Sequence, residues 1–145
     1  EIGFNYRLSN IQAAIGFAQL QNIDKILKKK EFIHNFYASL FSNNHICSLI
    51  RTPNFAKNNY WLNIIKFEKK NYSNLLSLCK KLDYLGIQTR PLWFANHLQK
   101  PFKKFQKYNI SDAIKMQESC LCLPSSLSLN SNDMRNIYKE IMRLI

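Results

Sequence analysis

The side chains with the clearest chemical potential lie in short segments, and the first one precedes a helix start. Asn5 and Arg7 come directly before Ser9 and Gln12, which have the S-x-x-Q spacing of a capping box. Amide and guanidinium groups beside a helix N-terminus suit a phosphate. The segment has neither of the common glycine-rich phosphate motifs, so from spacing alone an ordinary hydrogen-bonded loop is the simpler interpretation.

A second candidate segment surrounds a proline at the end of a predicted strand. Arg90 and Trp93 flank Pro91, and His97 follows four residues after the tryptophan. Loops that leave the end of a sheet often carry functional groups. The alternatives that spacing leaves open are an exposed arginine, a core tryptophan and a structural histidine.

Two further segments have simpler interpretations. The aromatic residues of 59–61 are expected to pack in the core, and the hydroxyls of 124–126 to form a turn. The nine acidic residues show no carboxylate pair, and no serine has an identifiable acid and base, so no residue is assigned a catalytic role. The four cysteines lack zinc-site spacing and are expected to be buried free thiols; no metal is expected.

The elements that must position these groups follow from hydrophobic periodicity. A helix is expected from Ser9, packed through its alanine and glycine face, and a longer one from Asp24. Later elements alternate strands with helices, and Gly86 and Pro91 end two of them. The expected strands cover 60–67, 87–90 and 121–124, and a last helix is capped by Ser131 or Asn132. The sequence therefore predicts an α/β or α+β fold in which helices back a small sheet.

The net charge of +12 raises the question of nucleic acid. The lysines are scattered along the chain rather than gathered in one stripe, so we expect a solvated basic surface and no nucleic-acid partner. No apolar run approaches the ~20 residues of a membrane span, so no membrane partner is expected.

Taken in order, the candidate segments resemble the nucleotide-sugar aminotransferases of the DegT/StrS-like family, which are fold-type I pyridoxal-phosphate enzymes. Residues 1–16 resemble that family's long G-x-N-x-R signature, and residues 86–97 and 121–126 resemble two later motifs. Residues 59–63 and 89–93 further resemble the branch that aminates the 4-keto group of UDP-linked N-acetyl-6-deoxyhexosamines in bacillosamine and legionaminic acid pathways.

The resemblance implies a domain organisation and a cofactor. Residues 1–23 would end the large domain with its dimer-interface helix, and residues 24–145 would form the C-terminal small domain of a fold-type I aminotransferase. The cofactor would be pyridoxal 5'-phosphate. Asn5 and Arg7 would reach its phosphate in the neighbouring subunit of a homodimer.

The resemblance also implies the substrates. Arg90, Trp93 and His97 would lie near a UDP-linked keto sugar, and glutamate would be the amino donor. The arginine would pair with the diphosphate or shape its pocket, the tryptophan would give an apolar wall, and the histidine would donate a hydrogen bond. The free thiols fit a reducing compartment, and a cytoplasmic location is expected.

The chain departs from the family in its length. The family's N-terminal domain carries the Schiff-base lysine, and no lysine here stands in that context, so this chain alone is expected to be an inactive fragment of a larger enzyme. The alternative is a catalytically inactive, stand-alone interaction or regulatory module that pairs with a full-length homologue.

Overall fold

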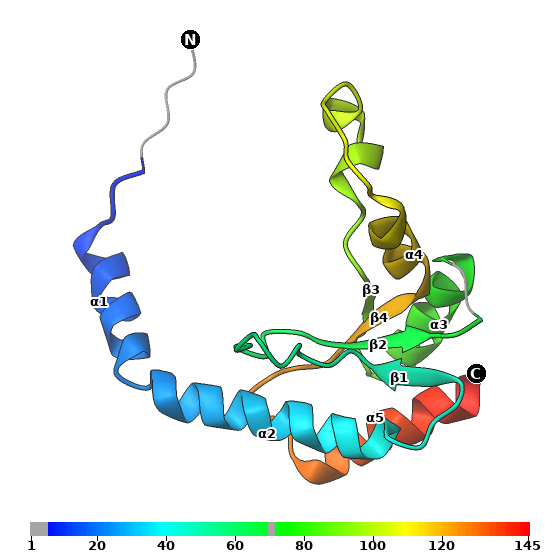
Figure 1. The fold of residues 1–145 in the computed structure, drawn as a ribbon. Coiled ribbons are helices and arrows are strands. Elements are labelled where there is room, and N and C mark those ends of the chain that lie inside the picture. The colour runs from blue at the N-terminus through cyan, green and yellow to red at the C-terminus, as the bar shows by residue number, and fades with distance from the viewer. Residues whose placement is uncertain (1–5, 70–71) are drawn as a thin grey trace.

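The fold, given by a computed structural model that describes residues 6–69 and 72–145, is a small antiparallel sheet with helices around it. Figure 1 shows the arrangement of its elements. The helices are α1 (Asn10–Leu20), α2 (Ile23–Phe41), α3 (Tyr72–Tyr84), α4 (Ser111–Ser119) and α5 (Ser131–Leu144), with short 3-10 turns η1 (Asn96–Leu98) and η2 (Lys100–Phe102). The strands are β1 (Cys47–Leu49), β2 (Asn63–Phe67), β3 (Arg90–Pro91) and β4 (Cys120–Leu123). The predicted α/β class is confirmed.

The sheet has the order β1-β2-β4-β3, and every neighbouring pair is antiparallel. Ile65 lies opposite Leu121, and Asn63 lies opposite Leu123. Residues that pair across a ladder share a face of the sheet. One face therefore carries these buried residues, and the other carries Ile64, opposite Cys122.

The hydrophobic core lies between the first of these faces and helices α2, α3 and α5. Each helix contributes an apolar stripe at helical spacing, as its sequence predicts. The buried members are Ile33, Tyr37 and Phe41 of α2, Leu75, Leu78 and Leu82 of α3, and Met134, Ile137 and Ile141 of α5. This packing fixes the sheet, from which the candidate site extends.

The first helix forms as predicted but does not pack as predicted. Ser9 Oγ accepts the backbone N–H of Gln12, and the Gln12 side chain accepts the N–H of Ser9, which completes the capping box. No residue of α1 is buried, and Ile11 and Ile15 are 75% and 60% exposed. Figure 1 shows why: α1 projects away from the sheet, so no other described element lies against its face.

The strand predicted for residues 60–67 begins three residues late. Tyr60 has a positive φ of 52°, which an extended strand does not allow. The side chains of Asn58 and Asn59 accept the backbone N–H groups of Tyr60 and Trp61, at 2.9 and 3.0 Å. These Asx turns replace ladder hydrogen bonds, so the ladder starts only at Asn63.

The strand predicted for residues 87–90 is also shifted, to Arg90–Pro91. Gly86 has a φ of +75° and ends α3 in a Schellman arrangement, in which the N–H of Ile87 donates to the carbonyl of Leu82 at 2.9 Å. The N–H of Ile87 is therefore used by the helix cap and not by a strand, and the Ile87 side chain is buried in the core.

The last helix begins one residue earlier than a cap at Ser131 would place it, and two earlier than a cap at Asn132. Asn130 is the cap: its Oδ1 accepts the N–H groups of Asn132 and Asp133, and the Asp133 carboxylate accepts the N–H of Asn130. Asparagine and aspartate thus form the reciprocal capping box. The prediction of Ser131 or Asn132 as the cap is wrong.

Candidate functional site

Asn5 and Arg7 are the predicted phosphate-binding residues, and only Arg7 belongs to the described part of the chain. Asn5 lies outside the described residues. Arg7 is exposed and precedes the N-cap Ser9 of α1. A cation at this place adds to the positive end of the helix dipole, so the local field favours an anion.

Arg90 lies on the edge strand β3, opposite Cys122 of β4. Its side chain is exposed, on the face of the sheet that the core does not use. Lys66, opposite Cys120, is exposed on the same face. Two exposed cations therefore lie on the face of the sheet that the core does not use, which favours an anionic ligand there.

Trp93 forms an aromatic pair that the sequence analysis did not predict. Its ring packs against that of Trp61 in a tilted arrangement, with centroids 5.5 Å apart and planes inclined by 43°. The two side chains are 65% and 62% exposed. The expectation that the aromatics of residues 59–61 pack in the core is wrong for Trp61, because the Asx turns before β2 carry it out of the ladder. Nothing in the sequence relates the two tryptophans.

The segment that carries Trp93 is anchored on both sides. The N–H of Leu92 donates to the carbonyl of Cys120 at 3.3 Å, which extends the sheet contact. The N–H of Ala95 donates to Oε1 of Gln117 at 2.7 Å, and Gln117 is a buried polar residue of α4. Trp93 is thus exposed on a short backbone segment that hydrogen bonds fix on both sides. Such a fixed position suits a side chain that contacts a ligand.

His97 lies in η1 and is half-buried. Its Nε2 is enclosed by protein and makes no hydrogen bond. The structure therefore does not direct this nitrogen toward the face of the sheet that the core does not use. The neighbouring exposed aromatics, Phe102 and Phe105, belong to the loop that Figure 1 shows rising beyond β3.

Neither a metal site nor a membrane-spanning helix is found among the described residues. No group of three His, Cys, Asp or Glu side chains in this part of the chain is placed to hold a metal ion. None of the helices described is long and apolar enough to cross a membrane. The four cysteines are free, as predicted, but only Cys47 and Cys120 are buried, while Cys79 and Cys122 are partly exposed.

The fold is a small α/β domain with aromatic and cationic side chains exposed beside its sheet. Residues 1–142 match the model of the DegT/DnrJ/EryC1/StrS aminotransferase family. The chain belongs to this family, and the resemblance seen in its motifs is confirmed.

Curated relatives cover the whole chain. GDP-perosamine synthase of Caulobacter vibrioides is 29% identical over 99% of this chain and 39% of the relative. UDP-4-amino-4,6-dideoxy-N-acetyl-beta-L-altrosamine transaminase of Campylobacter jejuni is 26% identical over 100% of this chain and 39% of the relative. The chain thus spans about 39% of the length of these relatives.

Solved structures confirm the fold. Helicobacter pylori PseC, an aminotransferase involved in the biosynthesis of pseudoaminic acid, superposes with a TM-score of 0.84 at 21% identity, covering 99% of this chain and 39% of that protein. The PLP form of a sugar aminotransferase from Streptococcus pneumoniae gives a TM-score of 0.83 at 17% identity, covering 96% of this chain and 37% of that one. These neighbours are fold-type I sugar aminotransferases.

Proposed function

We propose that this chain forms the C-terminal part of a pyridoxal-phosphate-dependent aminotransferase that aminates the 4-keto group of a UDP-linked sugar, with glutamate as donor. The observation that carries the proposal is the family match across residues 1–142. Relatives named for UDP- and GDP-linked amino sugars support a nucleotide-sugar substrate. Residues 1–23 would form the C-terminal end of the large domain, and residues 24–145 would form the small domain.

The cofactor's phosphate would be held at the start of α1. Pyridoxal phosphate, when bound, supplies the electron sink for amino-group transfer. Arg7 fits its phosphate because the guanidinium is always charged, exposed and next to a helix N-terminus. We assign Asn5 the same role, and we place both residues at the cofactor of a second subunit in a homodimer.

The sugar nucleotide would lie along the face of the sheet that the core does not use. Arg90 would pair with the diphosphate, and the Trp61–Trp93 pair would give an apolar wall for the sugar or the base. Since Nε2 of His97 is enclosed, Nδ1 is the ring atom that can donate a hydrogen bond to the substrate.

The Schiff-base lysine would be supplied by a large domain that lies outside this chain. The chain's match to about 39% of each relative supports this division, and the chain alone would then be inactive. The alternative, an inactive module that pairs with a full-length homologue, stays a prediction, as does the cytoplasmic location.

The two tryptophans make the proposal testable without an added probe. The chain has only these two, and both belong to the pair, so intrinsic fluorescence reports on this place alone. Titration with UDP-N-acetylglucosamine should change the emission in a saturable way. Arg90→Gln should weaken binding by about threefold to tenfold, because a cation beside a diphosphate is lost, whereas the exposed control Lys103→Gln should change it less than about twofold. Equal affinities of both variants and the original chain would contradict the proposed substrate site.

A further inference from the structure

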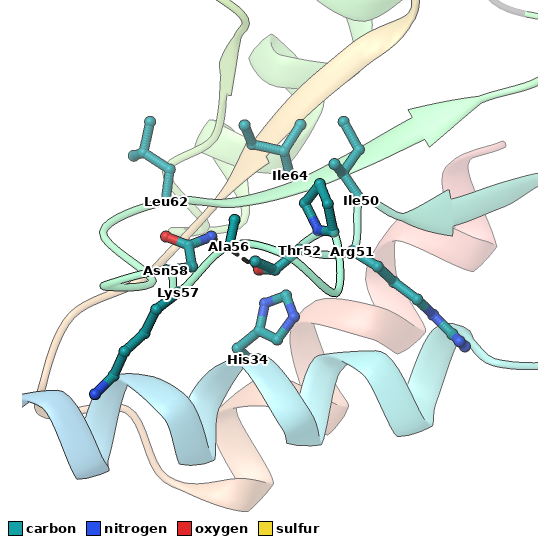
Figure 2. Close-up of a pocket in the computed structure, with 10 residues that line it drawn as sticks. His34, Ile50, Arg51, Thr52, Ala56, Lys57, Asn58, Leu62 and Ile64 are labelled. Atoms are coloured by element: carbon teal, nitrogen blue, oxygen red, sulfur yellow. Dashed lines mark hydrogen bonds between the residues drawn. The ribbon is translucent and has the colours of Figure 1, made fainter.

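A pocket separates α2 from the loop that precedes β2, and it holds a histidine that the proposed function does not use. Its volume is about 340 Å³. Figure 2 shows the His34 ring rising from α2 toward the loop, with Thr52 and Ala56 above it. His34 is only 8% exposed.

A chain of hydrogen bonds fixes the tautomer of His34. Its far end is the carbonyl oxygen of Leu123, which can only accept, so Ser125 Oγ–H donates to it at 3.1 Å. The lone pairs of Ser125 Oγ then accept the backbone N–H and the Nδ2–H of Asn63, at 3.2 and 3.0 Å. The amide orientation of Asn63 is thereby set, with Oδ1 turned to the histidine.

Oδ1 of Asn63 lies 3.0 Å from Nδ1 of His34, so Nδ1 must carry the proton. The ring of Tyr60 stacks on the imidazole with centroids 4.5 Å apart, which fixes its plane. Nε2 makes no hydrogen bond with the residues that the structure describes. A deeply buried ring is thus held rigidly with one nitrogen unused, on the wall of a pocket.

The charges around this nitrogen have one sign. Arg51 and Lys57 line the pocket, and Figure 2 shows their side chains running outward from the loop in opposite directions, with the His34 ring between them. No carboxylate is among the described residues that line it. Lys30, one turn before His34 on α2, donates to the carbonyl of Ser125 and adds a third cation nearby. An anion is therefore the ligand that the local field favours.

Among anions, a phosphoryl group fits the fixed imidazole in both of its protonation states. A protonated phosphoryl oxygen donates to the Nε2 lone pair, and an unprotonated one accepts from Nε2–H after the ring takes up a proton. The hydroxyl of Thr52 and the amide of Asn58, which bond each other at 3.2 Å, add neutral polar groups on the loop side of the pocket, across from His34.

We propose that this pocket binds a phosphoryl group, with Nε2 of His34 as the hydrogen-bonding atom and with Arg51 and Lys57 as the flanking cations. The inference does not rest on the proposed aminotransferase function. None of the residues that it uses is among those assigned above to the cofactor or the sugar nucleotide.

The test is an NMR titration of the 145-residue chain with inorganic phosphate at constant ionic strength. The imidazole Cε1–H signal of His34 should shift in a saturable way, and the signals of His45 and His97 should not follow it. A parallel titration with UMP separates the sources: tighter binding assigns the pocket to a nucleotide phosphate, and equal binding to free phosphate. A shift that never saturates, or tighter binding of glutamate than of phosphate, would overturn the proposal.

Variants locate the site. His34→Asn keeps a donor for Asn63 and removes the pocket nitrogen, so it should raise the dissociation constant of phosphate by about tenfold or more. Arg51→Gln and Lys57→Gln alter only exposed side chains and should each raise it about threefold, with the fold retained. Lys139→Gln, an exposed control of equal charge change on α5, should alter it less than about twofold. If Arg51→Gln and Lys57→Gln behave like this control, the proposal is wrong even where His34→Asn is unstable.

Discussion

The rings of Trp61 and Trp93 are in contact, with centroids 5.5 Å apart, although one residue precedes β2 and the other follows β3. Both are mostly exposed, so burial does not explain their pairing. Two large aromatic side chains at the surface of a domain are typical of a place where another molecule binds.

Removing either tryptophan should affect ligand binding more than stability. Trp61→Ala and Trp93→Ala should each lower the free energy of unfolding by no more than about 1.5 kcal/mol, the upper end for an aromatic pair beyond its burial. Each should weaken UDP-N-acetylglucosamine binding by about tenfold, because the apolar wall is lost. Urea denaturation and calorimetric titration measure the two effects. A large stability loss with unchanged affinity would make the pair structural.

Substitution by alanine should have opposite effects on stability at the two described glycines. Gly86→Ala should destabilise the chain by about 1 kcal/mol, because Gly86 has a φ of +75° at the end of α3. Gly16→Ala lies within α1, with nothing within 4 Å of the added Cβ, and should stabilise that helix by up to about 1 kcal/mol. Urea midpoints for global stability and circular dichroism for helix content test both changes. A loss of helix content in Gly16→Ala would contradict the exposed position of α1.

The cap of α5 offers a matched pair of asparagines. Asn130→Ala should lower stability by about 1 kcal/mol, because the N–H groups of Asn132 and Asp133 lose their acceptor. Asn132→Ala removes an exposed side chain within the helix and should cost less than about 0.5 kcal/mol. Equal losses in thermal unfolding would show that the cap is not at Asn130.

The thiol of Cys122 should make stability depend on pH in the alkaline range. Burial, with smaller contributions from Cys120 and Cys79, raises the pKa of Cys122 from 9.0 to about 11. The folded state therefore holds this proton more tightly than the unfolded chain, so stability falls as the pH rises from 9 to 11. Cys122→Ala should flatten this fall, as measured by urea midpoints at pH 8.0 and 10.5. An unchanged slope would contradict the raised pKa.

The helices could be predicted from the sequence because their signals are local. The S-x-x-Q box starts α1, and the apolar spacing of Ile33 and Tyr37 gives the core face of α2. The start of β2 could not be predicted, because the side chains of Asn58 and Asn59 accept backbone N–H groups that a longer strand would use in the sheet. That competition depends on a positive φ at Tyr60, which residue type does not indicate.

The candidate site could be predicted only in part. Arg90 and Trp93 stand out because Pro91 lies between them at a strand end. The contact of Trp93 with Trp61, and that of His34 with Asn63, join residues far apart in the chain. The first contact depends on how β2 and β3 are placed in the sheet, and the second on the packing of α2 against the sheet, so no local spacing predicts either.

The most direct test of the central claim places this chain in a complete enzyme. Residues 1–145 would replace the matching segment of the Campylobacter jejuni transaminase, which is 26% identical over the whole of this chain. The folded chimaera should bind pyridoxal phosphate and transfer the amino group of glutamate to a UDP-linked 4-keto sugar. We expect the chain alone to show no activity, because the proposed Schiff-base lysine would come from a large domain.

Cofactor affinity in this chimaera is the deciding measurement. We expect Arg7→Ala to weaken pyridoxal-phosphate binding by about tenfold to a hundredfold, because a charge-assisted hydrogen bond to the phosphate is worth about 1.5–3 kcal/mol. Mixing this variant with one that lacks the Schiff-base lysine should restore one working site in each heterodimer, since Arg7 would act across the interface. A folded, dimeric chimaera whose cofactor affinity is unchanged by Arg7→Ala would contradict the account.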